Sequence, residues 1–415
     1  MKKLMFFCAL ILGILFSAVN SQAFFVGFGA AGAAETVIKD GQDKGFITKA
    51  AIESEKPTTT SQLTHADTVW QKAWDGGNGD EGYGVAVDSS GNVYVTGDSF
   101  NGANYDCLTI KYNSNGDTIW QRVWNGGNDD YGYGIAVDSS GNVYVTGYSN
   151  NGINDDYLII KYDSNGDTVW QKAWNGGNDD YGYGIAVDSS GNVYVTGYFD
   201  NGVSSACLTI KYNSSGDTVW QKAWYGGNGD AGYGVAVDSS GNVYVIGYFN
   251  NGSTCDYLTI KYNSSGDTIW QKTWDSGHLD YGRGIALDSS GNVCVTGHSH
   301  NGSNNDYLTI KYNSNGDTIW QRIWNGGNDD AGNGIAVDSS DNVYVTGYSQ
   351  SVASYDYLTI KYDSNGDTIW QKVWDSGNGD AGYGVAVDSS DNVYVTGYSN
   401  ISANFDYLTI KYRQY

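Results

Sequence analysis

The sequence predicts an all-β protein built from seven copies of one four-stranded unit. A segment of fifty residues repeats with few substitutions: Tyr131–Tyr148 reads YGYGIAVDSSGNVYVTGY, and Tyr181–Tyr198 reads the same. All 14 tryptophans fall in pairs four residues apart, and the pairs recur every fifty residues from Trp70/Trp74 to Trp370/Trp374. A fixed period of this length is typical of repeat architectures, in which each unit packs against its neighbours.

Each copy contains four short runs that fit β-strands. In one copy these are Gly132–Asp138, Asn142–Tyr148, Asp156–Tyr162 and Asp167–Trp174, which are rich in β-branched or aromatic residues and bounded by turn residues. The last two runs are joined by an Asn-Gly turn, which is a strong hairpin signal because both residues tolerate positive φ. We name the four predicted strands A, B, C and D in chain order.

Side chains grow in size from strand A to strand D. Strand A carries Gly134 and Ala136, whereas strand D carries the two tryptophans. This gradient suits a wedge, because inner strands crowd around a central axis and outer strands spread apart. The sequence therefore predicts seven radial blades of four antiparallel strands, which is the architecture of a seven-bladed β-propeller.

The phase of the repeat predicts how the ring closes. The first recognisable strand, Asp67–Trp74, is a D strand, and the last, Asp406–Tyr412, is a C strand. The last blade has no D strand of its own, so we expect the N-terminal strand to pair into it. An open array would leave a tryptophan-rich strand unpaired at one end, which repeat proteins normally avoid.

The turn between strands A and B varies in one informative way. Most copies have a glycine there, such as Gly141, but the last two have Asp341 and Asp391. Aspartate enters the left-handed region more readily than most residues, so we expect the turn to keep its form with a positive φ at both aspartates.

The first residues resemble a secretory signal peptide. Lys2 and Lys3 precede the apolar run Leu4–Val19, and Ser21-Gln22-Ala23 fits a cleavage site. A transmembrane anchor is the alternative, for which the run is short. We expect an exported protein, located in the periplasm, outside the cell or on its surface. The predicted organisation is a signal peptide at 1–23, a flexible linker at 24–66 with a short helix around Ala50–Glu55, the propeller at 67–412 and a tail at 413–415.

Composition limits the partners. The net charge is −24 and the isoelectric point about 4.2, so nucleic acid is not expected as a partner, because phosphate binding needs a basic surface. We expect a monomer that binds a protein or a glycan and does not insert stably in a membrane after signal cleavage.

The cysteines do not suggest disulfide bonds. Four remain after the predicted cleavage: Cys107, Cys207, Cys255 and Cys294. Their spacing matches neither a disulfide framework nor a Cys-x-x-Cys metal site, so we expect free and mostly buried thiols.

Two motifs carry a family resemblance. GIAVDSSGNVYVTG, followed by DYLTIKYNSNGDTIWQ, resembles the SBBP-type β-propeller repeat of bacterial exported proteins, and the resemblance covers all seven copies. The first half is also similar to an NHL repeat, and the Gly-Asp-x-x-Trp part to quinoprotein propeller blades. The resemblance implies a seven-bladed propeller. It implies little about activity, because such repeats occur in exported scaffolds of mostly unassigned role.

The D–A and B–C loops of a propeller share one rim, which we call the top face. The B–C loops differ most between copies, which fits either a binding rim or unselected drift in solvent. Exposed tyrosines beside Asn and Asp would suit a protein or glycan partner. The predicted binding residues are Tyr105, Tyr131, Tyr133, Tyr181, Tyr183 and Tyr355.

Each D–A loop also holds an aspartate among other oxygen-rich side chains. These loops could bind Ca²⁺, which takes six to eight oxygen ligands, or form an acidic ring around the channel mouth. The alternative is that each aspartate caps a turn of its own backbone. The candidate ligands are Asp80, Asp130, Asp180, Asp230, Asp280, Asp330 and Asp380.

The fifth blade departs from the repeat. His278, His298 and His300 all map to its top, and Arg283 replaces the tyrosine found at most equivalent positions. Three imidazoles beside Asp280 could bind Zn²⁺ or supply a general base. Chance substitution in a tolerant loop is the alternative.

We therefore expect an exported, non-enzymatic propeller that binds a protein or glycan through its top face. One alternative is a metal-dependent lyase or hydrolase centred on the histidines of the fifth blade. The other is a purely structural surface or spacer protein.

Overall fold

The computed structural model describes residues 54–55, 66–77, 79–227, 229–352, 354–401 and 404–415. They belong to one compact unit, Ala51–Tyr415, and are built from strands, turns and loops, so the all-β prediction is confirmed. In the described part of the chain, no helix is long and apolar enough to cross a membrane. The predicted signal peptide and most of the predicted linker lie outside the described residues.

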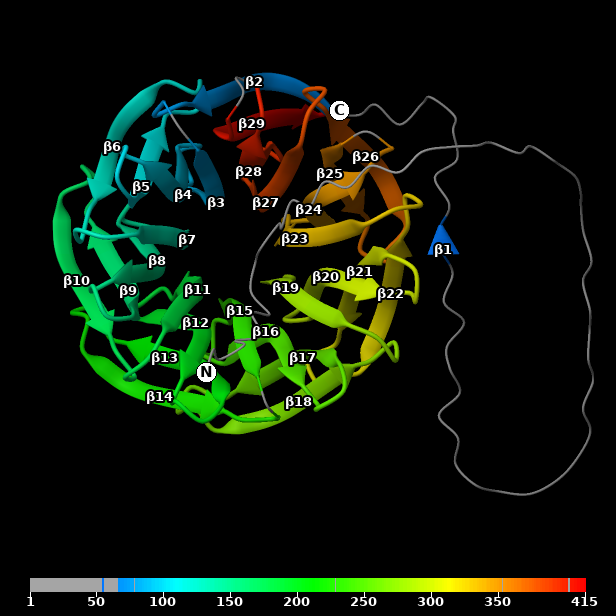
Figure 1. Cartoon of the computed structure of the whole chain (residues 1–415). Coiled ribbons are helices and arrows are strands. Elements are labelled where there is room, and N and C mark those ends of the chain that lie inside the picture. The colour runs from blue at the N-terminus through cyan, green and yellow to red at the C-terminus, as the bar shows by residue number, and fades with distance from the viewer. Residues whose placement is uncertain (1–53, 56–65, 78, 228, 353, 402–403) are drawn as a thin grey trace, which may run out of the picture. The chain divides into compact units, whose positions relative to one another are not determined.

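Seven antiparallel four-stranded blades surround a central axis, as predicted (Figure 1). Strand A of each blade lies at the axis and strand D at the outside. Blades 1 to 3 comprise β3 (Asp80–Val87), β4 (Val93–Phe100), β5 (Tyr105–Tyr112), β6 (Thr118–Trp124), β7 (Asp130–Val137), β8 (Val143–Asn150), β9 (Asp155–Tyr162), β10 (Thr168–Trp174), β11 (Asp180–Val187), β12 (Val193–Asp200), β13 (Ser205–Tyr212) and β14 (Thr218–Trp224). Blades 4 to 6 comprise β15 (Asp230–Val237), β16 (Val243–Asn250), β17 (Cys255–Tyr262), β18 (Thr268–Trp274), β19 (Asp280–Leu287), β20 (Val293–His300), β21 (Asn305–Tyr312), β22 (Thr318–Trp324), β23 (Asp330–Val337), β24 (Val343–Gln350), β25 (Tyr355–Tyr362) and β26 (Thr368–Trp374). Blade 7 comprises β27 (Asp380–Val387), β28 (Val393–Ser399), β29 (Asp406–Gln414) and β2 (Ala66–Trp74).

The ring closes through its N-terminal strand, which confirms the prediction from the repeat phase. β2 pairs antiparallel with β29, with Trp70 opposite Lys411, as Trp120 of blade 1 lies opposite Lys111. The Trp70 indole N–H donates to the Ser114 carbonyl of blade 1 at 3.2 Å, and Trp120 makes the equivalent bond to Ser164 at 3.3 Å. β2 is therefore the D strand of blade 7.

The predicted tail at 413–415 is wrong, because β29 runs on to Gln414. Blade 7 has no C–D turn of its own, and the Gln414 side chain replaces the serine carbonyl that such a turn supplies elsewhere. Its Oε1 accepts from the Trp370 indole at 3.1 Å and from Lys361 Nζ at 2.7 Å, where Trp320 and Lys311 use the Ser364 carbonyl. The strand is thus extended because its last polar side chain completes the contact with blade 6.

The predicted helix around Ala50–Glu55 is also wrong where the structure describes it. Ser54–Glu55 forms a short strand, β1, that pairs parallel with β22 on the outside of blade 5. The outer strands of a propeller have one unpaired edge, so a passing segment can add to that edge by main-chain hydrogen bonds.

Glycines in strand A allow the blades to meet at the axis. A Cβ at Gly134 would lie 2.7 Å from the Tyr183 carbonyl of the next blade, so any side chain would push the two strands apart. The register of every A–B pair shifts between the two glycines of the Gly-x-Gly motif, as between Gly132 and Gly134. The residue between them, Tyr133, is a β-bulge, and bulges redirect side chains near functional sites.

The hydrophobic core lies between blades rather than within one sheet. One cluster joins Tyr94, Cys107 and Trp120 of blade 1 to Ile135 and Val145 of blade 2. All four described cysteines are free and buried, as predicted. The contribution of each blade to the free energy of unfolding therefore depends on its packing against the neighbouring blade, as expected for a ring of repeats.

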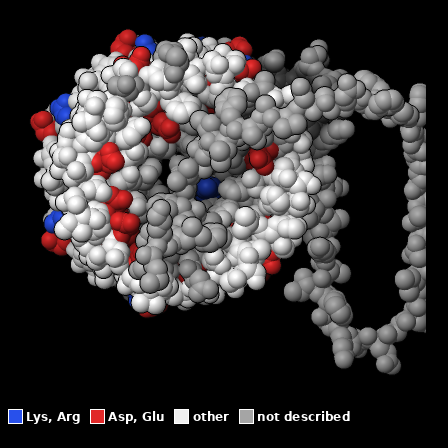
Figure 2. Space-filling model, in the orientation of Figure 1, with Lys and Arg blue, Asp and Glu red and all other residues white. Residues whose placement is uncertain are grey.

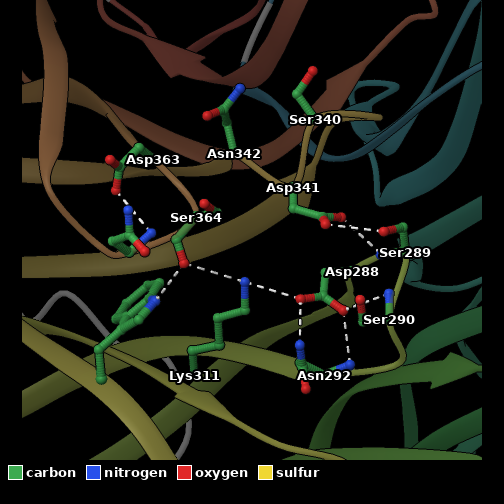
Figure 3. A network of polar contacts seen from close by, with 12 residues as sticks. Asp288, Ser289, Ser290, Asn292, Lys311, Ser340, Asp341, Asn342, Asp363 and Ser364 are labelled. Carbon is green, nitrogen blue, oxygen red and sulfur yellow. Dashed lines mark hydrogen bonds and ion pairs between the residues drawn. The ribbon is translucent and has the colours of Figure 1, made fainter.

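The A–B turns are held by the aspartate that follows strand A. In blade 5, Asp288 accepts from the backbone N–H groups of Ser290 and Asn292 at 2.9 and 2.8 Å (Figure 3). The two aspartates that replace glycine keep the turn, with φ of 64° at Asp341 and 60° at Asp391, so that prediction is confirmed.

These two aspartates should respond differently to glycine. The Asp341 carboxylate accepts from the backbone and hydroxyl of Ser289 in blade 5 at 2.8 and 2.9 Å (Figure 3). None of the hydrogen bonds described for Asp391 uses its side chain. We expect Asp341→Gly to be less stable than Asp391→Gly by about 1 kcal/mol, since only the first loses two hydrogen bonds. Denaturant titration of both variants measures this, and equal midpoints would contradict it.

Candidate functional site at the mouth of the central channel

The A strands enclose a cavity of about 160 Å³ on the axis of the ring. It is lined by the second glycine of each Gly-x-Gly motif and by the Val or Ile that follows, from Gly84 and Val85 to Gly384 and Val385. The side chains of the lining are apolar and nearly the same in every blade. The blades differ at the bulged residue between the two glycines of the Gly-x-Gly motif, which directly precedes this lining.

The seven bulged residues form a band of side chains that we call the collar. The Tyr83 and Tyr133 rings lie 5.0 Å apart between centroids, Tyr133 and Tyr183 5.3 Å, and Tyr183 and Tyr233 4.8 Å. Tyr83 also lies 5.2 Å from Tyr383, so five aromatic rings follow one another around the axis. The collar consists of Tyr83, Tyr133, Tyr183, Tyr233, Arg283, Asn333 and Tyr383.

A second tier of aromatic side chains supports the collar from strands A and B. Tyr131 stacks on Tyr148 at 4.8 Å and on Tyr133 at 6.0 Å, and Tyr181 lies 5.7 Å from Tyr198. Burial raises the pKa of Tyr133 well above its usual value, so its hydroxyl stays protonated. The same cause acts on three further collar tyrosines: Tyr83, Tyr183 and Tyr383.

The predicted binding tyrosines are half-buried rather than exposed, which corrects that expectation. Tyr131, Tyr133, Tyr181 and Tyr183 pack on one another, while Tyr105 lies 5.1 Å from Phe100 and Tyr355 lies 5.1 Å from Tyr348. Their order along the chain could not show this, because the contacts form between strands and between blades. All six side chains stay partly exposed, and aromatic side chains of this kind are enriched in binding sites.

Blade 1 carries a pair of acidic residues that sequence reasoning missed. Glu81 and Asp98 lie directly opposite each other on β3 and β4, where blade 2 has Tyr131 and Tyr148. The Tyr83 hydroxyl donates to Glu81 Oε2 at 3.0 Å. Asp98 is only 1% exposed, and burial together with the charge of Glu81 raises its pKa far above the usual value. The deviation from the repeat at both positions was visible in the sequence and could have identified them.

Blade 5 places a cation in the collar. The Arg283 guanidinium lies 4.6 Å from the centre of the Tyr233 ring, within the range of a cation–π contact. His298 lies beside Tyr281 at 5.1 Å, and burial and the charge of Arg283 lower its pKa to about 3, so it is neutral. Figure 2 shows basic atoms in the central hollow and acidic residues around the rim in view.

The three histidines do not form one site. The rings of His278 and His300 face each other with centroids 5.5 Å apart, whereas His298 is buried beside Tyr281. Among the described residues, no histidine belongs to a group of three potential metal ligands within 4.8 Å of one another. The geometry therefore does not bring the predicted zinc ligands together.

The seven D–A aspartates do not face the channel mouth. Each is fully buried, and each carboxylate accepts the backbone N–H of the residue four positions earlier at 2.5 to 2.8 Å. The turn-capping alternative therefore describes them, and the acidic ring at the mouth is wrong. The backbone N–H groups of each loop hold the carboxylate inward.

Two of these aspartates also lie in acidic clusters. Asp280 with Asp256 and Asp275, and Asp380 with Asp356 and Asp375, place three carboxylates within 4.8 Å of one another. Three carboxylates supply about half of the oxygens that Ca²⁺ takes. The calcium hypothesis stays a prediction for these two clusters.

The buried aspartates predict how stability changes with pH. Burial raises the pKa of Asp130, Asp280 and Asp330 to about 6 and that of Asp180 to about 7, from 3.8. A raised pKa means that the folded state holds the proton more tightly, so this stability is present below pH 4 and lost as pH rises to about 7.

We therefore expect the melting temperature to fall by several degrees from pH 5 to pH 8. Asp180→Asn keeps an acceptor for the Gly176 N–H without the ionisation, so it should melt higher than the parent at pH 8 and close to it at pH 5. Thermal melts of both proteins at the two pH values measure this. An unchanged pH dependence in the variant would contradict it.

Comparisons with known proteins agree with the architecture. The SBBP β-propeller repeat model matches residues 73–106, 124–154, 175–198, 320–353 and 375–406. Five of the seven repeats thus match this β-propeller repeat, as their motifs suggested. No curated protein matches the chain.

Solved structures share the fold at low sequence identity. The WD40 domain of Neurospora crassa Pan2 is 9% identical with a TM-score of 0.56, and the match covers 85% of this chain and 96% of that one. A polysaccharide lyase, ulvan lyase, is 12% identical with a TM-score of 0.49, and the match covers 81% of this chain and 95% of that one. Chaetomium thermophilum Sqt1 is 11% identical with a TM-score of 0.47, and the match covers 83% of this chain and 97% of that one. These similarities concern the fold alone.

Proposed function

We propose that the protein is an exported, non-enzymatic scaffold that binds a protein partner at the mouth of its central channel. The observation that supports this most directly is the collar, in which five tyrosine rings line the mouth at centroid distances of 4.8 to 5.3 Å. The A–B turns at the other face repeat almost unchanged between blades. The mouth is where blades of nearly identical sequence differ in chemistry.

Tyrosine suits such a site for two reasons. It offers a large rigid surface at low cost in conformational entropy, and its hydroxyl donates and accepts hydrogen bonds. The raised pKa values of Tyr83, Tyr133, Tyr183 and Tyr383 keep these four hydroxyls neutral, so they add no negative charge to the collar. A protein partner is favoured over a neutral glycan, because a net charge of −24 attracts basic segments from a distance.

The enzyme alternative has less support. It needed the three histidines of blade 5 to act together, and His298 lies apart from the facing pair His278 and His300. The buried and neutral state of His298 suits packing beside Arg283 more than acid–base exchange with a substrate.

Screening of the full chain on peptide and glycan arrays tests the proposal. Tyr183→Ala removes one collar ring. Val203→Ser is the matched control, because Val203 lies in a B–C loop and is 94% exposed in the parent. We expect peptide ligands that lose at least tenfold in affinity with Tyr183→Ala and stay within twofold with Val203→Ser. Ligands that depend on Val203 and not on Tyr183 would place the site in the loops and contradict the proposal.

A further inference from the structure

We infer that the channel mouth binds a lysine side chain of the protein partner, with the ammonium group at Glu81 and Asp98 and the aliphatic stem against the collar tyrosines. The inference rests on the proposed function, since it names the chemistry that the same site recognises. It depends on four features of blade 1 and the collar.

The first feature is an acidic pair in an unfavourable arrangement. Glu81 and Asp98 are directly opposite in an antiparallel pair, where like charges destabilise a sheet. Asp98 is 1% exposed, and its Oδ1 has no hydrogen-bond partner. A buried acceptor without a partner costs free energy, and a bound donor would recover it.

The second feature is that the pair lacks a cation of its own. Within the described ranges, no lysine or arginine forms an ion pair with either carboxylate. The Glu81 carboxylate accepts from the Tyr83 hydroxyl at 3.0 Å, and this donor is neutral. A partner's ammonium group would supply the positive charge that this chain does not provide.

The third feature is the aromatic surround, which selects the type of cation. Tyr83 lies between Tyr133 at 5.0 Å and Tyr383 at 5.2 Å, next to Glu81. Aromatic faces attract organic cations, whereas hard metal ions need six to eight oxygen ligands. The collar already holds one such cation, because Arg283 lies 4.6 Å from the Tyr233 ring centre.

The fourth feature is depth. Glu81 is partly exposed, whereas Asp98, its register partner on β4, is buried, so a ligand meets Glu81 first. Lysine carries a compact ammonium group on a flexible four-carbon stem that packs well on apolar surface. The guanidinium of arginine is broader and planar, whereas Asp98 is only 1% exposed, so the compact ammonium group suits this pair better.

Calorimetric titration of the full chain tests this with a blocked peptide, acetyl-Gly-Gly-Lys-Gly-Gly-amide, and its Nε-acetyl-lysine form. The variants are Glu81→Gln and Asp98→Asn, which replace each carboxyl group by an amide of nearly the same shape. Asp155→Asn is the matched control, because Asp155 also accepts a tyrosine hydroxyl on the top face, from Tyr181 at 2.9 Å. Thermal melts check that each variant folds.

We expect the parent to bind the lysine peptide at least tenfold more tightly than the acetylated one. Glu81→Gln should weaken that binding at least tenfold, Asp98→Asn should weaken it measurably, and Asp155→Asn should stay within twofold. Equal binding of both peptides, or equal effects of Glu81→Gln and Asp155→Asn, would overturn the inference. So would tighter binding of Ca²⁺ or a chitosan oligomer that depends on Glu81.

Tyr183→Ala separates this inference from the proposed function. If it weakens both peptides while Glu81→Gln changes neither, the collar is a binding site and the lysine assignment is wrong. If neither variant changes binding of any array ligand, both proposals fail.

Discussion

Deletion of β2 is expected to open the ring and lower the free energy of unfolding by more than about 5 kcal/mol. The strand supplies Trp70, whose ring lies 6.2 Å from both Tyr112 and Tyr394, and thus joins blade 7 to blade 1. It also supplies Gln71, whose Oε1 accepts from the Trp374 indole of blade 6 at 3.2 Å. Without β2, both contacts are lost and β29 presents an unpaired edge.

Thermal and denaturant unfolding of the full chain and of a chain that begins at Asp75 measure the effect. The control moves Ala66–Trp74 behind Tyr415 through a Gly-Ser linker, so that the strand pairs with β29 from the other end. We expect the moved strand to restore most of the stability. If the shortened chain melted like the parent, β2 would not be the element that closes the ring.

Lys311→Met is expected to cost about 3 kcal/mol, because it breaks a buried ion pair and leaves one charge behind. Lys311 Nζ lies 2.9 Å from Asp288 Oδ2, and both side chains are at most 4% exposed (Figure 3). Blade 5 needs this pair because Cys294 occupies the position from which a tyrosine hydroxyl reaches the carboxylate elsewhere, as Tyr94 reaches Asp88 at 2.9 Å. The lysine therefore replaces a missing donor.

Lys211→Met is the matched control, since Lys211 Nζ lies 5.1 Å from the Tyr194 ring centre and has no ion pair within the described residues. We expect it to cost about 1 kcal/mol or less. The double variant Cys294→Tyr with Lys311→Met should recover part of the loss by restoring a hydroxyl donor. Denaturant titration compares all three, and equal costs of the two single variants would refute the account of blade 5.

The fold was predictable because the same pattern of strand and turn residues occurs in all seven copies of the repeat. The Trp pairs located every D strand, and the offset between Asp67–Trp74 and Asp406–Tyr412 located the closure. The end of the chain was less predictable. Gln414 takes the place of a backbone carbonyl, and this substitution of a side chain for a main-chain group leaves no sequence signal.

The candidate site was predictable only in part. Comparison between copies identified Arg283, and the same comparison applied to Glu81 and Asp98 would have found the acidic pair. The acidic ring was wrong because local backbone N–H groups bind each carboxylate more closely than any channel feature, as Gly126 binds Asp130. Exposure of the tyrosines was misjudged because rings stack between strands, and this depends on geometry that the order of residues does not contain.

The central claim is that the collar at the channel mouth is the binding surface. Hydroxyl-radical footprinting of the full chain, alone and with the tightest ligand from the peptide and glycan arrays, tests it most directly. We expect at least twofold protection of the collar tyrosines, with Tyr225 unchanged, because that side chain is 49% exposed on a D–A loop away from the collar. Protection confined to the B–C loops or to the outer D strands would contradict the claim.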